Sequence, residues 1–244
     1  LHNFPLDPTP DTLSLYVVFQ SHHIEPRSVD AYLSGICSEL EQFYPSVRSN
    51  RRSPLVARTL KGCKRLYSKP VQRKRALTRE DLNLVYSSLA HTDSYDDLLF
   101  LSLLLTGFHA LLRLGELVWP DQRERRSYRK LSRRTSVKIS DISFEFALQS
   151  HKTDRQFAGD TVLVHQTVSG ANPLRAFRTY LASRDRRHPG RSELWLKFDG
   201  TVPTRSWFSR RLHRFFPADV SGHSMRAGGA TALALDGVPH ASIQ

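Results

Sequence analysis

Residues 98–117, LLFLSLLLTGFHALLRLGEL, carry the strongest structural signal in this sequence. The apolar run Leu98 to Leu105 favours a helix. The pair Thr106-Gly107 predicts an interruption, after which the helical pattern resumes. Arg113 lies within the resumed segment, and Glu116 follows it one helical turn later. The stretch therefore predicts a helical region with a charge pair embedded in apolar sequence.

Downstream of this stretch the pattern changes from helical to strand-like. Apolar residues recur at nearly every second position, a spacing typical of strands: they are Val137, Ile139, Ile142, Phe144, Phe146 and Leu148. A second β-rich run covers Thr161 to His165, and the polar stretch Gln149 to Asp160 separates the two, so we expect a hairpin with a polar tip. Residues 173–183, 204–216 and 222–236 return to helical spacing. This part of the chain is therefore predicted to be mostly helical with a small antiparallel sheet.

Upstream, residues 1–77 read as all-helical. Thr9-Pro10 predicts an N-cap followed by proline in the first helical turn. A second helix is predicted from a stripe at i, i+3, i+4, i+7 spacing, made of Val29, Tyr32, Leu33, Ile36, Cys37, Leu40, Phe43 and Tyr44 and stopped by Pro45. A new helix begins at Leu77-Thr78, because Thr78 and Asp81 form a capping-box pattern. The sequence thus predicts two domains, residues 1–77 and 78–244.

Composition and charge limit the function classes. The chain has 244 residues, with 36 Lys plus Arg against 23 Asp plus Glu, which gives a net charge of +13. This excess makes a polyanion the expected partner. No stretch approaches the ~18 consecutive apolar residues of a membrane span, and we expect neither a membrane nor a small-molecule partner. Cys37 and Cys63 are the two cysteines, too few for a disulfide scaffold or a cysteine-rich zinc module.

The basic residues are clustered. Arg48 to Arg75 contains eleven Lys or Arg and no acid, and Arg123 to Lys138 contains Glu124 as its only acid. A third cluster joins Arg205, Arg210, Arg211 and Arg214. Solvated basic faces are the simpler interpretation, but dense, nearly acid-free runs favour phosphate-backbone binding. The predicted phosphate-contacting residues lie on a helix over residues 54–67 and in the basic segment after it; they are Arg58, Lys61, Lys64, Arg65, Arg73, Lys74 and Arg75.

Three segments of the predicted second domain form one pattern. They are TGFHALLRLGEL (106–117), QSHKTDR (149–155) and SGHSMRAGGATALALDGV (221–238). Together they resemble the tyrosine recombinases, the phage-integrase-like enzymes that break and rejoin DNA. In that family an arginine lies in a TG-x-R-x-x-E-L-like segment, a lysine on a β-hairpin, and a His-x-x-Arg pair at the start of a later helix. The matching residues are Arg113, Glu116, Lys152, His223 and Arg226. The longer first segment is similar to the eukaryotic Crypton-type or fungal mobile-element branch.

The resemblance implies a helical, SAM-like core-binding domain that contacts double-stranded DNA, followed by an α+β catalytic domain. Arg113 and Arg226 would clamp the scissile phosphate, since a planar guanidinium binds two phosphate oxygens and stays charged. Lys152 would protonate the leaving 5′ oxygen as general acid. His223 would assist proton transfer at the nucleophile or hold a phosphate oxygen, and Glu116 would orient Arg113. Neither a metal nor another cofactor is expected.

Each of these residues also has a simpler interpretation. Arg113 and Glu116 could form only a buried salt bridge. A hairpin lysine such as Lys152 is usually exposed and without function, and a His-x-x-Arg pair is common by chance. Their occurrence together and in the family's order, within a basic protein, favours the recombinase interpretation.

The family's nucleophile is a tyrosine near the C-terminus, and this sequence has no counterpart to it. All eight tyrosines precede His223. We expect that the chain stops before the nucleophilic segment, with a tyrosine roughly 20–35 residues beyond Gln244 in the natural reading frame, within a couple of helices. As written, the chain would bind DNA without cleaving it.

For the complete protein, the resemblance implies site-specific recombination or transposon integration through a 3′-phosphotyrosyl intermediate. Four copies would act on two DNA duplexes, in the nucleus if the source is eukaryotic. One alternative is a catalytically inactive DNA-binding protein on the same fold. The other is a generic basic RNA-binding or scaffold protein, although no RNA-recognition signature favours it.

Overall fold

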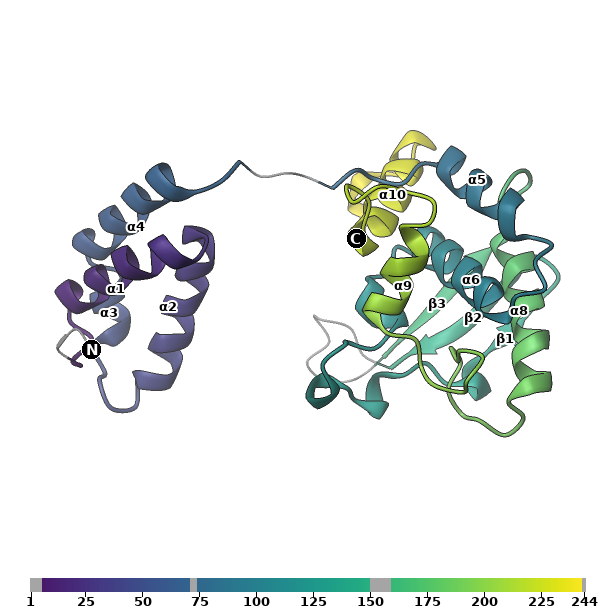
Figure 1. Cartoon of the computed structure of the whole chain (residues 1–244), viewed down its shortest axis with the longest axis horizontal. Helices are drawn as coiled ribbons and strands as arrows, with labels where there is room; N and C mark the ends of the chain where they lie inside the picture. Colours follow the sequence, from purple (N-terminus) through teal and green to yellow (C-terminus); the bar gives the residue numbers. More distant parts are fainter. Residues whose placement is uncertain (1–5, 71–73, 150–158, 243–244) are drawn as a thin grey trace. The chain divides into compact units, whose positions relative to one another are not determined.

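The computed structural model describes residues 6–70, 74–149 and 159–242. The chain divides into two compact units, Leu1–Gln72 and Arg73–Gln244, which are called unit 1 and unit 2 below. Both units are mainly helical, and unit 2 also contains a sheet (Figure 1). None of the described helices is long and apolar enough to cross a membrane.

The described part of unit 1 is a bundle of helices. They are α1 (Pro10–His23), α2 (Pro26–Leu40), α3 (Val47–Arg51) and α4 (Pro54–Tyr67). α1 begins at the predicted cap, where the Thr9 hydroxyl accepts a hydrogen bond from the backbone amide of Thr12. α4 begins in the same way, with the Ser53 hydroxyl accepting from the amide of Val56. In both helices a proline follows the cap, where its missing N–H costs no helical hydrogen bond.

The core of unit 1 is small, and the stripe predicted for α2 is narrower than expected. The buried cluster consists of Leu13, Val17, Val29, Leu33, Val56 and Cys63. Tyr32, which belongs to the predicted apolar stripe, is 52% exposed because only the line Val29, Leu33 and Cys37 faces the other helices. Phe43 is 70% exposed. α2 ends before it, at Leu40, so helical spacing no longer places Phe43 on the buried side.

Unit 2 combines a helical layer with a three-stranded antiparallel sheet. Its helices are α5 (Arg79–Leu89), α6 (Tyr95–His109), α7 (Leu114–Leu117), α8 (Pro173–Arg187), α9 (Arg205–Leu212) and α10 (Gly222–Leu235), and its strands are β1 (Lys138–Ile139), β2 (Ser143–Leu148) and β3 (Asp160–His165). Short 3₁₀ turns lie at Arg123–Arg125, Tyr128–Lys130, Arg134–Ser136 and His240–Ser242. The predicted capping box of α5 is present, since Thr78 and Asp81 each accept a backbone hydrogen bond from the other.

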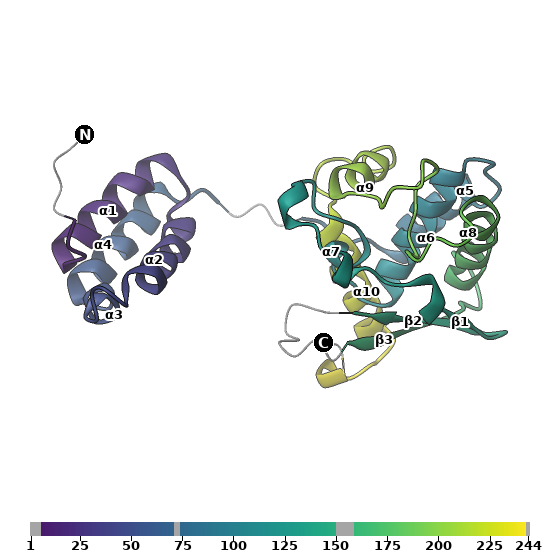
Figure 2. The same cartoon turned by 90° about the horizontal axis from the view of Figure 1, so that it is seen from below.

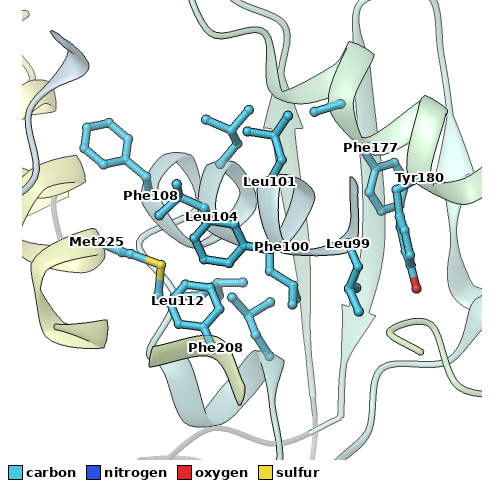
Figure 3. Packing of buried hydrophobic residues seen from close by; sticks show 14 of the residues in the cluster. Leu99, Phe100, Leu101, Leu104, Phe108, Leu112, Phe177, Tyr180, Phe208 and Met225 are labelled. Atoms are coloured by element: carbon cyan, nitrogen blue, oxygen red, sulfur yellow. The ribbon is translucent and has the colours of Figure 1, made fainter. Parts of the chain in front are cut away.

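α6 is the central helix of unit 2. It packs against α5, α8 and α10, and Figure 3 shows its apolar side chains between residues of α8, α9 and α10. The interruption expected at Thr106-Gly107 is wrong, because α6 continues to His109. Gly107 is helical here because α10 packs onto it: a Cβ atom at Gly107 would lie 3.0 Å from the Met225 sulfur. Tertiary packing thus outweighs the low helix propensity of glycine.

The sheet has the order β1-β2-β3, and the expected hairpin is formed by β2 and β3 in antiparallel register, with Phe144 opposite Val164. One face is buried against the helices through Phe144, Phe146, Leu148, Val162 and Val164. Phe144 stacks on Phe177 of α8 with ring centroids 3.9 Å apart. Figure 2 shows the strands along one side of unit 2, with α6 and α8 on the same side of the sheet. The polar tip, residues 150–158, lies outside the described residues.

Candidate functional site

The turn after α6 brings Arg113 to the surface of unit 2. The amide of Leu111 donates to the Phe108 carbonyl (3.4 Å), and the amide of Leu112 donates to the Gly107 carbonyl (3.0 Å). This is the hydrogen-bond pattern of a Schellman motif, which normally has glycine at its left-handed position. Leu111 occupies that position here with φ of 53°, at a cost of about 1–2 kcal/mol. The chain therefore reverses within three residues, and Arg113 follows directly.

Glu116 holds Arg113 in place from one helical turn away. Arg113 is the residue before the first of α7. Its backbone amide donates to Glu116 Oε2 (2.7 Å) and its Nη1 donates to Oε1 (3.1 Å). The Glu116 side chain is only 10% exposed, whereas that of Arg113 is 37% exposed. The carboxylate thus fixes the base of the arginine while part of the guanidinium stays open to solvent.

α10 lies so close to Leu77 and to the end of α6 that two of its positions have no room for a side chain. A Cβ atom at Gly228 would collide with the Leu77 carbonyl oxygen, and one at Gly229 with the Phe108 carbonyl oxygen. The amide of Leu77 also donates a hydrogen bond to the first turn of α10 (3.0 Å). These contacts set the position of Arg226, which precedes Gly228 by two residues in α10.

Arg113 and Arg226 line the same open cleft, with a volume of about 590 Å³. Glu116, the turn at residues 110–112, Leu148 of β2 and residues 160–163 of β3 complete its lining. Arg226 is half-buried, and its side chain forms no hydrogen bond or ion pair with the described residues. The structure therefore brings the two predicted arginines together from distant segments and leaves the second guanidinium available to a ligand.

The other two predicted catalytic residues are placed less closely. His223 is exposed and lies one turn before Arg226 on α10, but it does not contribute to the lining of the cleft. Lys152 lies outside the described residues. The strands that flank its segment do reach the cleft, which is lined by Leu148 at the end of β2 and Asp160 at the start of β3.

The tyrosines placed in the core cannot act as nucleophiles in this arrangement. Tyr180 is fully buried, its hydroxyl donates to the Leu194 carbonyl (3.0 Å) and accepts from the Leu196 amide (2.9 Å), and burial raises the pKa of its phenol. Burial also raises the pKa of Tyr95 to about 12. Among the described residues, no three His, Cys, Asp or Glu side chains gather as a metal site would require.

The predicted phosphate-contacting residues of α4 divide into two kinds. Arg58, Lys61 and Arg65 are exposed on one face of the helix, and none forms an ion pair within the described residues. Lys64 is instead paired with Asp30, with Nζ 2.9 Å from Oδ2. The hydrogen bond from Lys64 lowers the pKa of the Asp30 carboxyl. Lys64 therefore has a structural partner that sequence reasoning did not anticipate.

The basic segment before α5 is also partly engaged. Lys74 is exposed, and its Nζ donates to the Ala218 carbonyl (2.7 Å). Arg75 forms an ion pair with Asp81, with Nη1 2.6 Å from Oδ2, and this hydrogen bond raises the pKa of Arg75. Arg73 lies outside the described residues. Arg75 thus ties this segment to α5, and its charge is partly neutralised.

Sequence reasoning did not foresee the left-handed turn at Leu111 or the wall of the cleft formed by β3. The turn carries no signal, because glycine or asparagine is the usual residue there. The Gly228-Gly229 pair in α10 was a usable signal, since adjacent glycines in a helix indicate close approach of another backbone.

Comparison with solved structures identifies the fold. No family model and no curated protein sequence matches the chain. Among solved structures, it is similar to the Tn1549 transposon integrase in complex with transposon right end DNA, with a TM-score of 0.63, 14% identity, and coverage of 99% of this chain and 78% of the integrase. The lambda integrase dimer bound to a core site gives a TM-score of 0.57 and 14% identity over 97% of this chain and 75% of that one. XerA recombinase gives 0.50 and 14% over 95% and 79%.

The chain has the fold of the tyrosine recombinases. The predicted fold class, a helical core-binding part and a mainly helical catalytic part with a small antiparallel sheet, is confirmed by these similarities. On this tyrosine-recombinase fold, the segments that carry Arg113 and Arg226 are brought side by side by the contact between α6 and α10.

Proposed function

We propose that this protein binds double-stranded DNA and that the full-length protein cleaves and rejoins DNA strands in site-specific recombination or transposon integration. The observation that carries the proposal is the shared cleft of Arg113 and Arg226. Cleavage of a phosphodiester concentrates negative charge on the non-bridging oxygens of the transition state. Two guanidinium groups held at fixed positions stabilise that charge.

The roles of the other residues follow from the same chemistry. A tyrosine oxygen would attack the scissile phosphorus, forming a 3′-phosphotyrosyl bond and releasing the 5′ oxygen, which Lys152 would protonate as general acid. Glu116 keeps Arg113 oriented, and His223, exposed one turn before Arg226, would assist proton transfer or hold a phosphate oxygen. Attack of a 5′ hydroxyl on the phosphotyrosyl bond restores the strand, so no nucleotide cofactor is consumed.

The wider setting is proposed by analogy. The similar structures include a transposon integrase bound to transposon-end DNA and a lambda integrase dimer bound to its core site. We propose that this chain likewise assembles on DNA, as four copies on two duplexes. A Crypton-like or fungal mobile element, acting in the nucleus, is the source that the TGFHALLRLGEL segment favours.

A second candidate function is a DNA-binding protein without cleavage activity on the same fold. The observation that favours it is the burial of Tyr95 (7% exposed) and Tyr180 (0% exposed) in the core of unit 2, where neither phenol can reach a phosphate.

The test is nicking of a suicide substrate, in which the cleaved strand cannot be rejoined, by the full-length protein. Arg113→Ala and Arg226→Ala should each lower the cleavage rate by about 10²–10³, as expected for loss of one transition-state donor, while duplex affinity falls by less than about tenfold. Arg175→Ala is the matched control, because Arg175 is exposed on α8 without an ion pair among the described residues. Wild-type cleavage by both variants would overturn the proposal. Duplex binding without cleavage by the wild type would select the second candidate.

A further inference from the structure

A basic loop, residues 121–130, lies between α7 and β1 and takes no part in the cleft described above. Its cations Arg123, Arg125, Arg129 and Lys130 are exposed, and their side chains form no hydrogen bond or ion pair with the described residues. The loop contains two acids. Asp121 accepts a hydrogen bond from the Ser206 amide at the start of α9 (3.1 Å), and Glu124 is exposed. The loop therefore presents a local excess of unneutralised positive charge.

The loop is fixed at its beginning. The Trp119 amide donates to the Pro203 carbonyl (2.9 Å), and the Arg205 amide donates to the Trp119 carbonyl (2.9 Å). The guanidinium of Arg126 lies 5.3 Å from the centre of the Trp119 ring, and Tyr128 packs edge-on against the same ring at 5.1 Å. Trp119 thus supports both the start and the middle of the loop.

The loop is also fixed at its end. The amide of Leu194 donates to the Ser132 carbonyl (2.9 Å), and Leu131 packs in a buried cluster with Leu196 and Val202. A surface anchored at both ends loses little conformational entropy when a ligand binds to it. The backbone that carries the four cations is therefore largely preorganised.

The loop adjoins the helix that begins next to Arg113. Arg125 and Lys130 share the lining of a small cavity, of about 40 Å³, with Gly115 and Glu116 of α7. The guanidinium of Arg205 also lies next to α7, because a Cβ atom at Gly115 would lie 2.8 Å from Arg205 Nη2. The Arg205 side chain also forms no ion pair within the described residues. Cations from two separate segments therefore lie beside α7.

We propose that the loop cations Arg123, Arg125, Arg129 and Lys130, together with Arg205, form a backbone-binding surface for the duplex that flanks the scissile phosphate on the Arg113 side. This inference rests on the proposed function, because that function places a duplex in the adjoining cleft. Each cation neutralises one phosphate and releases condensed counterions. A membrane surface fits less well, because Tyr128, 62% exposed, is the only large apolar side chain that the loop exposes as an anchor.

The experiment compares the duplex binding of a loop variant with that of a control variant. The loop variant carries Arg123→Ala, Arg125→Ala, Arg129→Ala and Lys130→Ala. The control carries Arg175→Ala and Arg186→Ala on α8, which lies across unit 2 from α7 in Figure 2; both residues are exposed and form no ion pair among the described residues. The slope of log affinity against log salt should fall by about 2–4 units in the loop variant and by less than about one unit in the control. A hydroxyl-radical footprint should shorten on one flank in the loop variant alone.

Arg205→Ala, outside the loop, gives an independent reading and should lower the slope by about one unit. A wild-type slope and footprint in both the loop variant and Arg205→Ala would overturn the inference. The inference would also be overturned if the loop variant bound duplex DNA like the wild type but no longer bound anionic lipid vesicles or single-stranded RNA. If cleavage still depends on Arg113 and Arg226 in that case, the proposed function survives and only this surface is wrong. If the wild type does not bind duplex DNA, both proposals fail.

Discussion

The Arg113–Arg226 cleft and the basic face of α4 both present cations, but they are built in different ways. In the cleft, Arg113 is held by a carboxylate that is only 10% exposed, and Arg226 is placed by a helix contact with no room for a side chain. On α4, Arg58, Lys61 and Arg65 extend into solvent without a partner among the described residues. Stabilising a transition state requires a charge at a fixed position. Attracting a polyanion requires only the charge.

This difference predicts that small changes in packing should damage the cleft and leave the α4 face intact. Gly229→Ala places a Cβ atom against the Phe108 carbonyl oxygen, which is backbone and cannot move aside cheaply. We expect a loss of about 1–3 kcal/mol in the free energy of unfolding, the range typical of an overpacked core site. The measurement is chemical denaturation followed by circular dichroism.

Gly62→Ala in α4 is the matched control, because a Cβ atom at Gly62 would meet no atom within 4 Å. There the same substitution should stabilise the helix by about 0.5–1 kcal/mol. Equal effects at the two positions would mean that the close approach of α10 and α6 is not important for stability.

The next prediction concerns how the free energy of unfolding depends on pH. His109 ends α6 beside the Arg113 turn, its Nε2 is buried with no hydrogen-bond partner among the described residues, and burial, assisted by Arg79, lowers its pKa to about 4. Between pH 6.5 and 4, His109 is therefore protonated in the unfolded state and neutral in the folded state. Stability should be complete above about pH 6.5 and fall by up to about 3 kcal/mol as pH drops through this window.

His109→Leu should remove this slope from the pH profile of the unfolding free energy. His23→Gln, at an exposed position of α1, is the control and should retain it. Carboxylates also lose stabilising interactions when they are protonated at lower pH. For Asp199, burial raises the pKa, but hydrogen bonds from Lys197 and Thr201 outweigh it and lower the pKa to about 2. A profile of His109→Leu identical to the wild type between pH 6.5 and 4 would show that His109 is not the titrating group.

A smaller change tests whether the function of Arg113 depends on its hydrogen bonds to Glu116. Glu116→Gln keeps the size of the side chain but loses the charge that binds the Arg113 amide and guanidinium. Hydrogen bonds to charged groups contribute about 1.5–3 kcal/mol, so suicide-substrate cleavage by the full-length protein should slow by about 10- to 100-fold. Duplex affinity should stay within twofold. Glu39→Gln, at an exposed position of α2 without a partner among the described residues, should affect neither.

The sequence predicts the helices and strands of this fold better than the contacts between them. Local signals were sufficient for the α1 cap, the α5 capping box and the β2–β3 hairpin, because capping and alternation are properties of adjacent residues. They failed at Thr106-Gly107, where α10 packs onto α6 and keeps it helical. They also failed at Leu111, whose left-handed backbone is imposed by the turn and not by its residue type.

The same distinction applies to the site. The arginines and the glutamate could be named from the resemblance to the tyrosine recombinases, and the structure places Arg113, Glu116 and Arg226 around one cleft. That convergence depends on the docking of α10 on α6. The Gly228-Gly229 pair indicates that some backbone lies close to α10, but it does not say which one. The ion pairs Lys64–Asp30 and Arg75–Asp81 were not predicted either. The first joins residues of two different helices, and the second joins α5 to the segment before it.

The smallest predicted effects belong to the α4 face, where position should hardly matter. Lys61→Ala and Arg65→Ala should each lower the slope of log duplex affinity against log salt by about one unit, since each cation neutralises about one phosphate. Lys64→Ala should lower it less, because Lys64 already pairs with Asp30. Arg65→Lys keeps the charge and should retain the wild-type slope, whereas Arg226→Lys in the cleft should still slow cleavage, because an ammonium cannot replace the planar fork. A large loss of duplex affinity in Arg65→Lys would show that α4 recognises geometry as the cleft does, and the contrast between the two regions would fall.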